Sequence, residues 1–275
     1  MKDELEEFKR KSVVISPVGG KGSRFIPPQL ASLIEQKFGK KTLEELYLPK
    51  HLLKIGEKTL LEFFITPYKK FGINVFVFLL GKGAEPIQDF LGDGSKFGIE
   101  IRYSYDPLVS KVGKGKAIKY AYDQKVIDVE EEPYVHVGFP DDLILYPFFV
   151  EEYSARFLYY KKRWDCYGVV VLSYYRSPFG EVEVERGNGR IKDFVEKPLS
   201  EKLANTGRYV YDSRKVLPYI QKIDLNSSQA IEFEEAVLTP LAKEGKLGYY
   251  ILPTENDWIP INSLKDYERA LYLLR

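Results

Sequence analysis

The sequence is poor in several features that would place it in other classes of protein. Cys166 is the only cysteine, which excludes a disulfide within the chain and indicates a reducing compartment such as the cytoplasm. Lysine and arginine total 41 and aspartate and glutamate 40, so no strong basic field favours nucleic acid as the main partner. The longest apolar run, residues 75–80, is too short to span a bilayer, and the charged start, residues 1–11, is unlike a signal peptide.

What the sequence does contain is an alternation of strand and helix patterns. Short β-branched and aromatic runs alternate with stretches of helical periodicity through the first half of the chain. That alternation predicts an α/β fold with a doubly wound, mostly parallel sheet. At 275 residues the chain is long enough to bury a sizeable core as one domain.

The most informative stretch joins a buried strand to a glycine-rich loop. The apolar residues 13–18 are followed by Gly19, Gly20 and Gly22, and Arg24 comes shortly after them. Glycine permits close backbone approach to a ligand, and the N–H groups of such a loop can hold an anion. The alternative is an ordinary strand-to-helix turn with a surface arginine.

Two familiar phosphate-binding loops do not fit this stretch. A P-loop would end in Gly-Lys-Ser or Gly-Lys-Thr, and a dinucleotide fold would place a third glycine at a wider spacing. A dinucleotide-dependent oxidoreductase is therefore disfavoured.

A pair of acidic residues follows a later strand. Asp141 and Asp142 come directly after the run of residues 134–139 and Pro140. Ligands of open α/β sheets bind beyond the carboxyl ends of strands, and carboxylate oxygens suit Mg²⁺. A helix cap or a turn is the alternative explanation for the pair. His136, within the strand, is expected to be a packed core histidine.

Several ordered motifs together resemble a known family. "GGKGSRFIP" and "PKHLLKI...KTLLE" near the N-terminus, then "PDDLI", "FGEV...IKDFVEKP" and "GRYV", are similar to the sugar-1-phosphate nucleotidyltransferases. Within that family the bacterial-type UTP–glucose-1-phosphate uridylyltransferases are the nearest match. The resemblance implies a Rossmann-like nucleotidyltransferase fold with an inserted β-hairpin that binds the sugar.

The resemblance also implies roles for individual residues. Backbone groups of two glycine loops would hold the nucleotide, positive side chains would neutralise its phosphates, and an aspartate pair would hold Mg²⁺. The sugar phosphate would be bound by the strand after the hairpin and by the hairpin's exit. The implied residues are Gly19, Gly20, Gly22, Gly113 and Gly115 for the nucleotide, Arg24, Lys50 and Asp141 for catalysis, Asp141 and Asp142 for the metal, and Glu196, Lys197 and Gly207 for the sugar phosphate.

The sequence departs from the family pattern at three places. Pro260 stands where the family has a second metal-binding aspartate, and we expect Asp142 rather than Asp257 to take over that role. The glutamine that reads the nucleobase has no clear counterpart upstream of Gly113. Residues 29–48 form an insertion, either a lid over the nucleotide or, as we favour, a surface helix.

The resulting hypothesis is an enzyme that joins an NTP, with UTP favoured, to a sugar 1-phosphate, with glucose 1-phosphate favoured. Residues 1–275 would form one catalytic domain, with a nucleotide-binding half at 12–145 and a sugar-binding half at 146–275. Mg²⁺ is the expected cofactor; neither nucleic acid nor a membrane is an expected partner, and a homo-oligomer is left open. The alternative is a regulatory homologue that binds a sugar nucleotide without turnover, which Pro260 supports.

Overall fold

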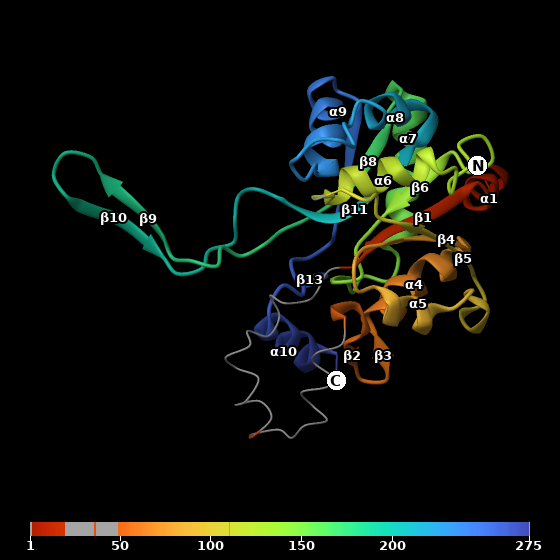
Figure 1. The fold of residues 1–275 in the computed structure, drawn as a ribbon. Helices are drawn as coiled ribbons and strands as arrows, with labels where there is room; N and C mark the ends of the chain where they lie inside the picture. The colour runs from red at the N-terminus through yellow and green to blue at the C-terminus, as the bar shows by residue number, and fades with distance from the viewer. Residues whose placement is uncertain (1, 20–35, 37–48, 110, 275) are drawn as a thin grey trace.

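A seven-stranded sheet forms the centre of the molecule (Figure 1). The computed structural model describes residues 2–19, 36, 49–109 and 111–274. The strand order is β12-β8-β11-β6-β1-β4-β5. The strands are β1 (Ser12–Val18), β4 (Val75–Leu80), β5 (Glu100–Tyr105), β6 (Tyr134–Val137), β8 (Gly168–Ser173), β11 (Ala204–Asp212) and β12 (Leu247–Ile251).

All strands of this sheet run parallel except β11, which is antiparallel to both of its neighbours. This confirms the predicted doubly wound, mostly parallel architecture. Strand β1 lies between β4 and β6, so that Val14 pairs with Phe76 on one side and with His136 on the other. The chain thus continues from β1 to one side through β4 and β5 and later returns to the other side with β6. The carboxyl ends of β1 and β6 therefore flank a topological switch point, where ligands bind in open α/β sheets.

Helices cover both faces of the sheet. Because side chains alternate along a strand, Val14 faces one helical layer while Val13 and Ile15 face the other. The first layer contains α1 (Lys2–Arg10), α4 (Leu60–Phe71), α5 (Glu85–Leu91) and α7 (Phe149–Trp164). The second contains α6 (Gly113–Asp123), α8 (Ser213–Ile220) and α9 (Thr239–Lys243).

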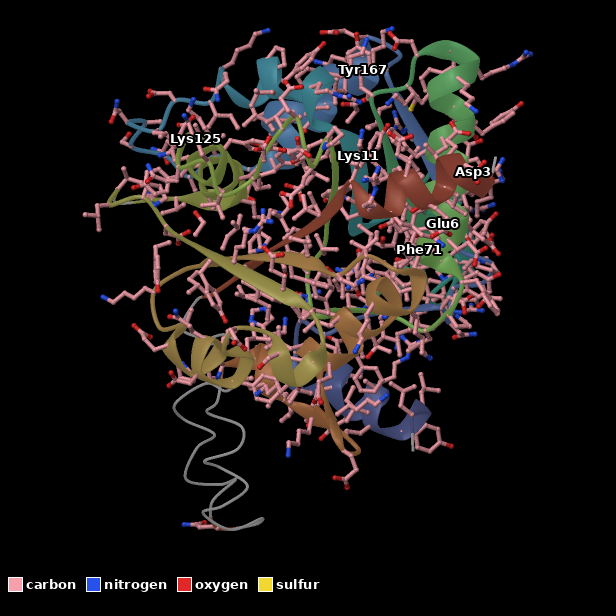
Figure 2. The ribbon with its side chains drawn as sticks, turned by 90° about the vertical axis from the view of Figure 1, so that its right-hand side faces the viewer. Asp3, Glu6, Lys11, Phe71, Lys125 and Tyr167 are labelled. Carbon is pink, nitrogen blue, oxygen red and sulfur yellow. The ribbon has the colours of Figure 1, made fainter. Side chains whose placement is uncertain are left out.

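The charged helix α1 lies along the end of the first layer, as Figure 2 shows. Its Phe8 is buried in the core, while Glu6 stays on the surface and pairs with Lys9 at 2.8 Å. The Lys9 ammonium also lies 4.8 Å from the centroid of the Phe71 ring at the end of α4. An amphipathic sequence thus places its apolar residues inward and leaves its charges exposed.

A smaller apolar cluster holds the C-terminal segment against the chain around residue 55. Ile259 and Leu143 pack there because β7 (Asp142–Ile144) pairs antiparallel with β13 (Trp258–Pro260). Helix α10 (Leu264–Leu273) begins with the predicted capping box between Ser263 and Asp266. Nearby lie the short elements η1 (Lys50–Leu52), β2 (Lys54–Ile55) and β3 (Lys58–Thr59), while η2 (Ser95–Phe97) precedes β5.

The predicted hairpin is present and stands away from the body of the molecule (Figure 1). It consists of β9 (Glu181–Glu185) and β10 (Arg190–Val195), whose residues are all exposed. Val184 pairs with Ile191 and Val182 with Phe194, so that one face of the hairpin is apolar.

The helix predicted for residues 231–243 begins later than expected. The Ile231 carbonyl accepts a hydrogen bond from the Gly115 amide at 2.8 Å, and the Ile231 amide donates one to the Val112 carbonyl at 3.2 Å. These bonds hold Ile231 as extended chain, and the segment then passes through the π-helical turn η3 (Glu234–Leu238) before α9. Helix α8 and strand β7 were not predicted.

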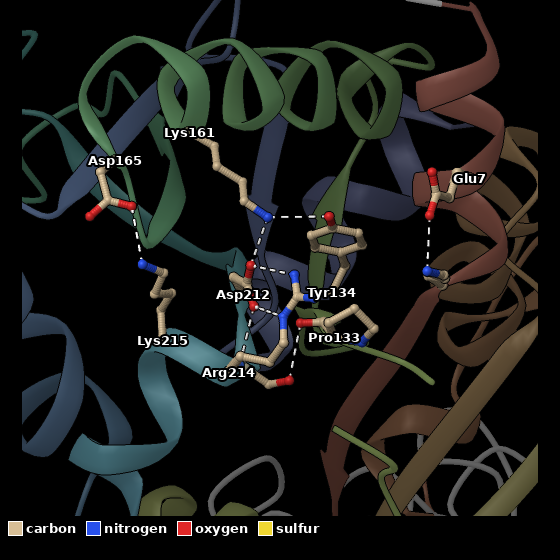
Figure 3. Close-up of polar contacts among 10 residues, drawn as sticks. Glu7, Pro133, Tyr134, Lys161, Asp165, Asp212, Arg214 and Lys215 are labelled. Atoms are coloured by element: carbon tan, nitrogen blue, oxygen red, sulfur yellow. Dashed lines mark hydrogen bonds and ion pairs between the residues drawn. The ribbon is translucent and has the colours of Figure 1, made fainter. Parts of the chain in front are cut away.

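An ionic network lies where β11 ends, beside the start of β6 (Figure 3). This is the edge of the sheet formed by the amino ends of the parallel strands, opposite the switch point. The buried Asp212 carboxylate accepts hydrogen bonds from Lys161 at 2.7 Å and from Arg214 at 2.8 and 2.9 Å. Burial alone would raise the pKa of Asp212, but the hydrogen bonds from Arg214 and Lys161 outweigh it and hold the pKa below its usual value. Asp212 is therefore ionised and ties α7 and α8 to β11.

We expect Asp212→Asn to lower the free energy of unfolding by about 2 to 4 kcal/mol at neutral pH, because two cations lose their buried counter-charge. Since the folded-state pKa is depressed, this contribution is present above the unfolded-state pKa and is lost as pH falls through the folded-state value. Urea unfolding of parent and variant should therefore give a constant difference above about pH 5 that shrinks below about pH 4. An absent difference at pH 7 would contradict this.

Candidate active site

The candidate site is centred on a turn of residues 139–142, called here the acidic turn, at the carboxyl end of β6. The Asp142 amide donates to the Phe139 carbonyl at 3.1 Å, which closes the turn, and β7 begins directly after it. The Asp141 carbonyl accepts from the Ile261 amide at 2.8 Å. The backbone of the turn is thus tied to the C-terminal segment, which approaches from far along the chain.

Lys50 and Asp141 meet in this site as an ion pair. The Lys50 ammonium lies 2.8 Å from Asp141 Oδ2, and the two side chains are 17% and 26% exposed. Pro49 precedes the short helix η1, which contains the partly buried Lys50 and the buried His51. Burial alone would raise the pKa of Asp141, but the neighbouring His51 and Lys50 outweigh it, so that the pKa lies below its usual value. The structure thus brings together two residues, 91 positions apart in the chain, that the family resemblance assigned to catalysis.

Asp142 lies in a different electrostatic environment from Asp141. Burial raises the pKa of Asp142 to about 7, and the adjacent Asp141 charge contributes to the rise. Its Oδ1 accepts a hydrogen bond from the Trp258 indole at 3.0 Å. Adjacent carboxyl groups with separated pKa values are typical of functional sites. At neutral pH, Asp141 is therefore ionised, whereas the pKa of Asp142 lies close to neutral pH.

Pro260 lies directly opposite Asp142 in the antiparallel pair of β13 and β7. Side chains of directly opposed residues lie on the same face, about 4.5–5.5 Å apart at Cβ. Asp257 instead accepts hydrogen bonds from the amide and hydroxyl of Thr254, both at 2.8 Å, and closes its own turn. Asp142 is therefore the direct neighbour of the substituted position, while the metal-binding role expected of Asp142 stays a prediction.

Gly19 and Gly207 lie where the neighbouring atoms leave no room for a side chain. A Cβ on Gly19 would lie 2.6 Å from the Gly81 backbone, which joins the ends of β1 and β4. A Cβ on Gly207 would lie 2.7 Å from the Phe139 ring and 3.0 Å from the Asp142 carboxylate. Gly207 has a φ of +74°, which favours glycine. Gly207 is therefore part of the site's wall.

The second glycine loop packs against another part of the chain. A Cβ on Gly113 or Gly115 would lie 2.5 or 2.8 Å from the Ile231 carbonyl oxygen. This close backbone approach accounts for both glycines without a ligand. Their role in nucleotide binding stays a prediction.

The predicted residues Glu196 and Lys197 lie at the base of the projecting hairpin. Both are exposed, and their side chains face each other with a separation of 3.7 Å. No hydrogen bond or ion pair between described residues joins either of them to the acidic turn. Gly20, Gly22 and Arg24, with the insertion at 29–48 apart from Gln36, lie outside the described residues.

Sequence reasoning missed a polar cluster beside the acidic turn. Lys114, at the start of α6, lies 4.9 Å from the Phe139 ring centroid and 2.5 Å from the Glu234 carboxylate. Tyr209 also donates to Glu234, at 2.8 Å. The acidic residues around Glu234 were visible in the sequence, but their pairing with Lys114 depends on the packing of α6 against η3.

The site can be tested for a metal by the chemistry of its donors. Within the part of the chain that the structure describes, no group of three or more His, Cys, Asp or Glu side chains could hold a metal ion. Mg²⁺, however, commonly takes only one or two protein carboxylates and completes its shell with water and substrate phosphates. Asp141, with Asp142 beside it, fits that pattern. Among the described helices, none is long and apolar enough to cross a membrane.

A switch-point site with an acidic turn and a paired lysine lies in an α/β fold, and comparison with known proteins identifies the family. The family model described as nucleotidyl transferase matches residues 46–275, and the chain belongs to that family. A UTP–glucose-1-phosphate uridylyltransferase from Synechocystis is 25% identical over 238 residues, which cover 82% of this chain and 57% of that protein. The chain spans about half the length of the first curated relatives it matches.

Solved structures share the fold. A candidate glucose-1-phosphate thymidylyltransferase from Bacillus anthracis, in complex with sucrose, superimposes with a TM-score of 0.67 at 23% identity and covers 96% of both chains. A UDP-glucose pyrophosphorylase in complex with UDP-glucose gives a TM-score of 0.62 at 20% identity, with 95% of this chain and 97% of that chain covered. These structures confirm the predicted fold, and the family match confirms the predicted nucleotidyltransferase family.

Proposed function

We propose that this protein joins a nucleoside triphosphate to a sugar 1-phosphate, with UTP and glucose 1-phosphate as the favoured pair. The observation that carries the proposal is the Lys50–Asp141 pair at the switch point between β1 and β6. A phosphate-neutralising cation and a carboxylate for a divalent cation are the two groups that such a transfer needs most. The family and its uridylyltransferase relative support this choice of reaction.

In the proposed reaction, a phosphate oxygen of the sugar 1-phosphate forms a bond to the α-phosphorus of the NTP. The bond from that phosphorus to the bridging oxygen breaks, and pyrophosphate leaves. No protein nucleophile is required, and the only thiol fits that, since Cys166 is buried and burial raises its pKa to about 11. The protein's contribution is to position the phosphates and neutralise their charge.

Each residue has an assigned part in this proposal. Gly19, with Gly20 and Gly22, lines the nucleotide phosphates, and Arg24 and Lys50 neutralise their charge. Asp141, assisted by Asp142, would hold Mg²⁺, which supplies positive charge to the phosphates when bound.

Gly113 and Gly115 contact the nucleoside, and Gly207, Glu196 and Lys197 bind the sugar phosphate. Since β1 and β6 both come from residues 12–145, we assign that part to the nucleotide and residues 146–275 to the sugar.

Glu196 and Lys197, which follow the hairpin strand β10, must come close to the acidic turn if they are to bind the sugar phosphate. Both residues are exposed, at the base of a hairpin that stands away from the body of the molecule (Figure 1), and no hydrogen bond or ion pair among the described residues joins them to the acidic turn. In this proposal they reach a sugar phosphate at Asp141 through a movement of the hairpin base toward the body when the substrate binds. Closure of this kind would also exclude water from the transferring phosphate.

We expect UTP with glucose 1-phosphate to give the highest rate in a panel of NTPs and sugar 1-phosphates assayed with Mg²⁺ for pyrophosphate release. A site that forms hydrogen bonds with the edge of one nucleobase discriminates strongly against other nucleobases, because a wrong base leaves buried polar groups of the protein unpaired. Higher rates with dTTP or GTP would contradict the nucleotide assignment. If none of the substrate pairs gave pyrophosphate and the protein still bound a sugar nucleotide tightly, the result would favour the alternative of a non-catalytic homologue, for which Pro260 is the main support.

A further inference from the structure

Arg208 is a buried cation beside the acidic turn. It is 2% exposed, and its guanidinium donates to the Phe139 carbonyl at 2.5 Å and to the Asp142 carbonyl at 2.6 Å. The guanidinium carbon lies 4.8 Å from the centroid of the Phe64 ring. One side chain of β11 therefore bridges the first and last residues of the turn that contains Asp141.

Such an arrangement is costly for a residue that only fills space. Burying a guanidinium loses its hydration, and two carbonyl groups return only part of that free energy. Within the described part of the chain, Arg208 Nε has no hydrogen-bond partner, and no ion pair joins Arg208 to a carboxylate. An apolar side chain of similar volume would give a more stable core. The cation at this position thus favours a functional role.

The surrounding backbone is shaped to admit this side chain. A Cβ on Gly138 would lie 2.7 Å from the guanidinium and 2.7 Å from the Phe64 ring. Strand β11 shifts its register between Asn205 and Arg208, at the left-handed Gly207, and Arg208 follows this irregularity directly. Both features set the direction of the Arg208 side chain toward the acidic turn.

We propose that Arg208 is a positioning residue that holds the acidic turn, so that the Asp141 carboxylate faces Lys50 and the site of phosphoryl transfer. It acts through the backbone of Phe139 and Asp142, while the Ile261 amide holds the Asp141 carbonyl. The planar fork of arginine can serve both carbonyls in one fixed geometry, which a lysine ammonium cannot reproduce. This inference rests on the proposed function of the same site.

The kinetic test compares Arg208→Lys and Arg208→Met with the parent protein. Both variants should lower kcat by about 10²-fold, since small displacements of reacting groups have effects of that size. Both should need more Mg²⁺ for half-maximal rate, while the KM for the nucleotide stays close to the parent value. Arg214→Met is the matched control, because it removes a guanidinium bound to Asp212 at the opposite edge of the sheet. The control should lower the melting temperature and leave kcat and the Mg²⁺ dependence unchanged.

A second readout does not depend on turnover. Trp258 donates its indole N–H to Asp142, so that its fluorescence reports the position of the turn once Trp164, the other tryptophan, is replaced by phenylalanine. Arg208→Lys should shift the Trp258 emission, and Gly138→Ala, which crowds the guanidinium without removing it, should shift it in the same way. If the parent protein proves inactive with every substrate, the proposed function fails, and this signal still tests the position of the turn.

Two results would overturn the inference. The first is parent-like kcat, Mg²⁺ dependence and Trp258 emission in Arg208→Lys and Gly138→Ala. The second is a loss of stability in Arg208→Met, matching that of Arg214→Met, with no change in kcat or emission. Arg208 would then be a structural residue only.

Discussion

Replacing Lys50 with methionine should reduce turnover by about 10²- to 10³-fold, the usual effect of removing one preorganised positive donor. Methionine keeps most of the side-chain volume but loses the ammonium that lies 2.8 Å from Asp141. The transferring phosphates would lose a neutralising charge, and the Asp141 carboxylate would lose its counter-ion. The measurement is initial-rate pyrophosphate release at saturating NTP, sugar 1-phosphate and Mg²⁺. Arg24→Ala is expected to behave similarly from its place after the glycine loop.

The control for this variant is Lys161→Met. Lys161 makes an equally short ion pair, 2.7 Å from the buried Asp212, on the far edge of the sheet. Both variants lose a buried counter-charge and should be destabilised, but only Lys50→Met should lose turnover. Near-parental rates in Lys50→Met, or equal losses in the two variants, would remove Lys50 from the proposed site.

Introducing an aspartate at position 260 should lower the Mg²⁺ concentration for half-maximal rate by about 10- to 100-fold, because ligand charge strongly tunes affinity for hard cations. Pro260 faces Asp142 across the β13–β7 pair, so that a new carboxylate would lie beside the existing two. The proline contributes no side-chain oxygen and no amide donor, so the change does not break a hydrogen bond of the parent. A Mg²⁺ titration of the rate compares Pro260→Asp with the parent.

Pro260→Asn separates charge from shape in this experiment. It restores the amide and a side chain of similar size without adding a negative charge, and it should leave the Mg²⁺ dependence near that of the parent. An equal gain in Pro260→Asn would point to the backbone rather than the metal. A fast parent enzyme that Pro260→Asp does not improve would show that the proline is harmless and would reject the non-catalytic alternative.

Much of the fold follows from local pattern in the sequence. The β-branched run of β1, the periodicity of α4 and the capping box at Ser263 each define an element through interactions between near neighbours. Lys50 was selected from a motif that resembles the family, and Asp141 both from that resemblance and because it follows a strand. Their contact, between residues 91 positions apart, depends on tertiary packing, because Lys50 lies in the short helix η1 and Asp141 follows β6.

The sequence by itself determined the doubly wound sheet, the positions of its strand ends and the family, because these depend on side-chain periodicity and on short motifs. Only the tertiary structure placed Pro260 opposite Asp142, aimed Arg208 at the acidic turn and paired Lys114 with Glu234. Each of these contacts joins segments that no local pattern relates. The Lys114–Glu234 pair depends on the packing of α6 against η3, and the other two contacts depend on a strand register or a bulge. A shift of one residue in a strand register would turn these side chains to the other face, so their placement is decided by the packing of the whole chain.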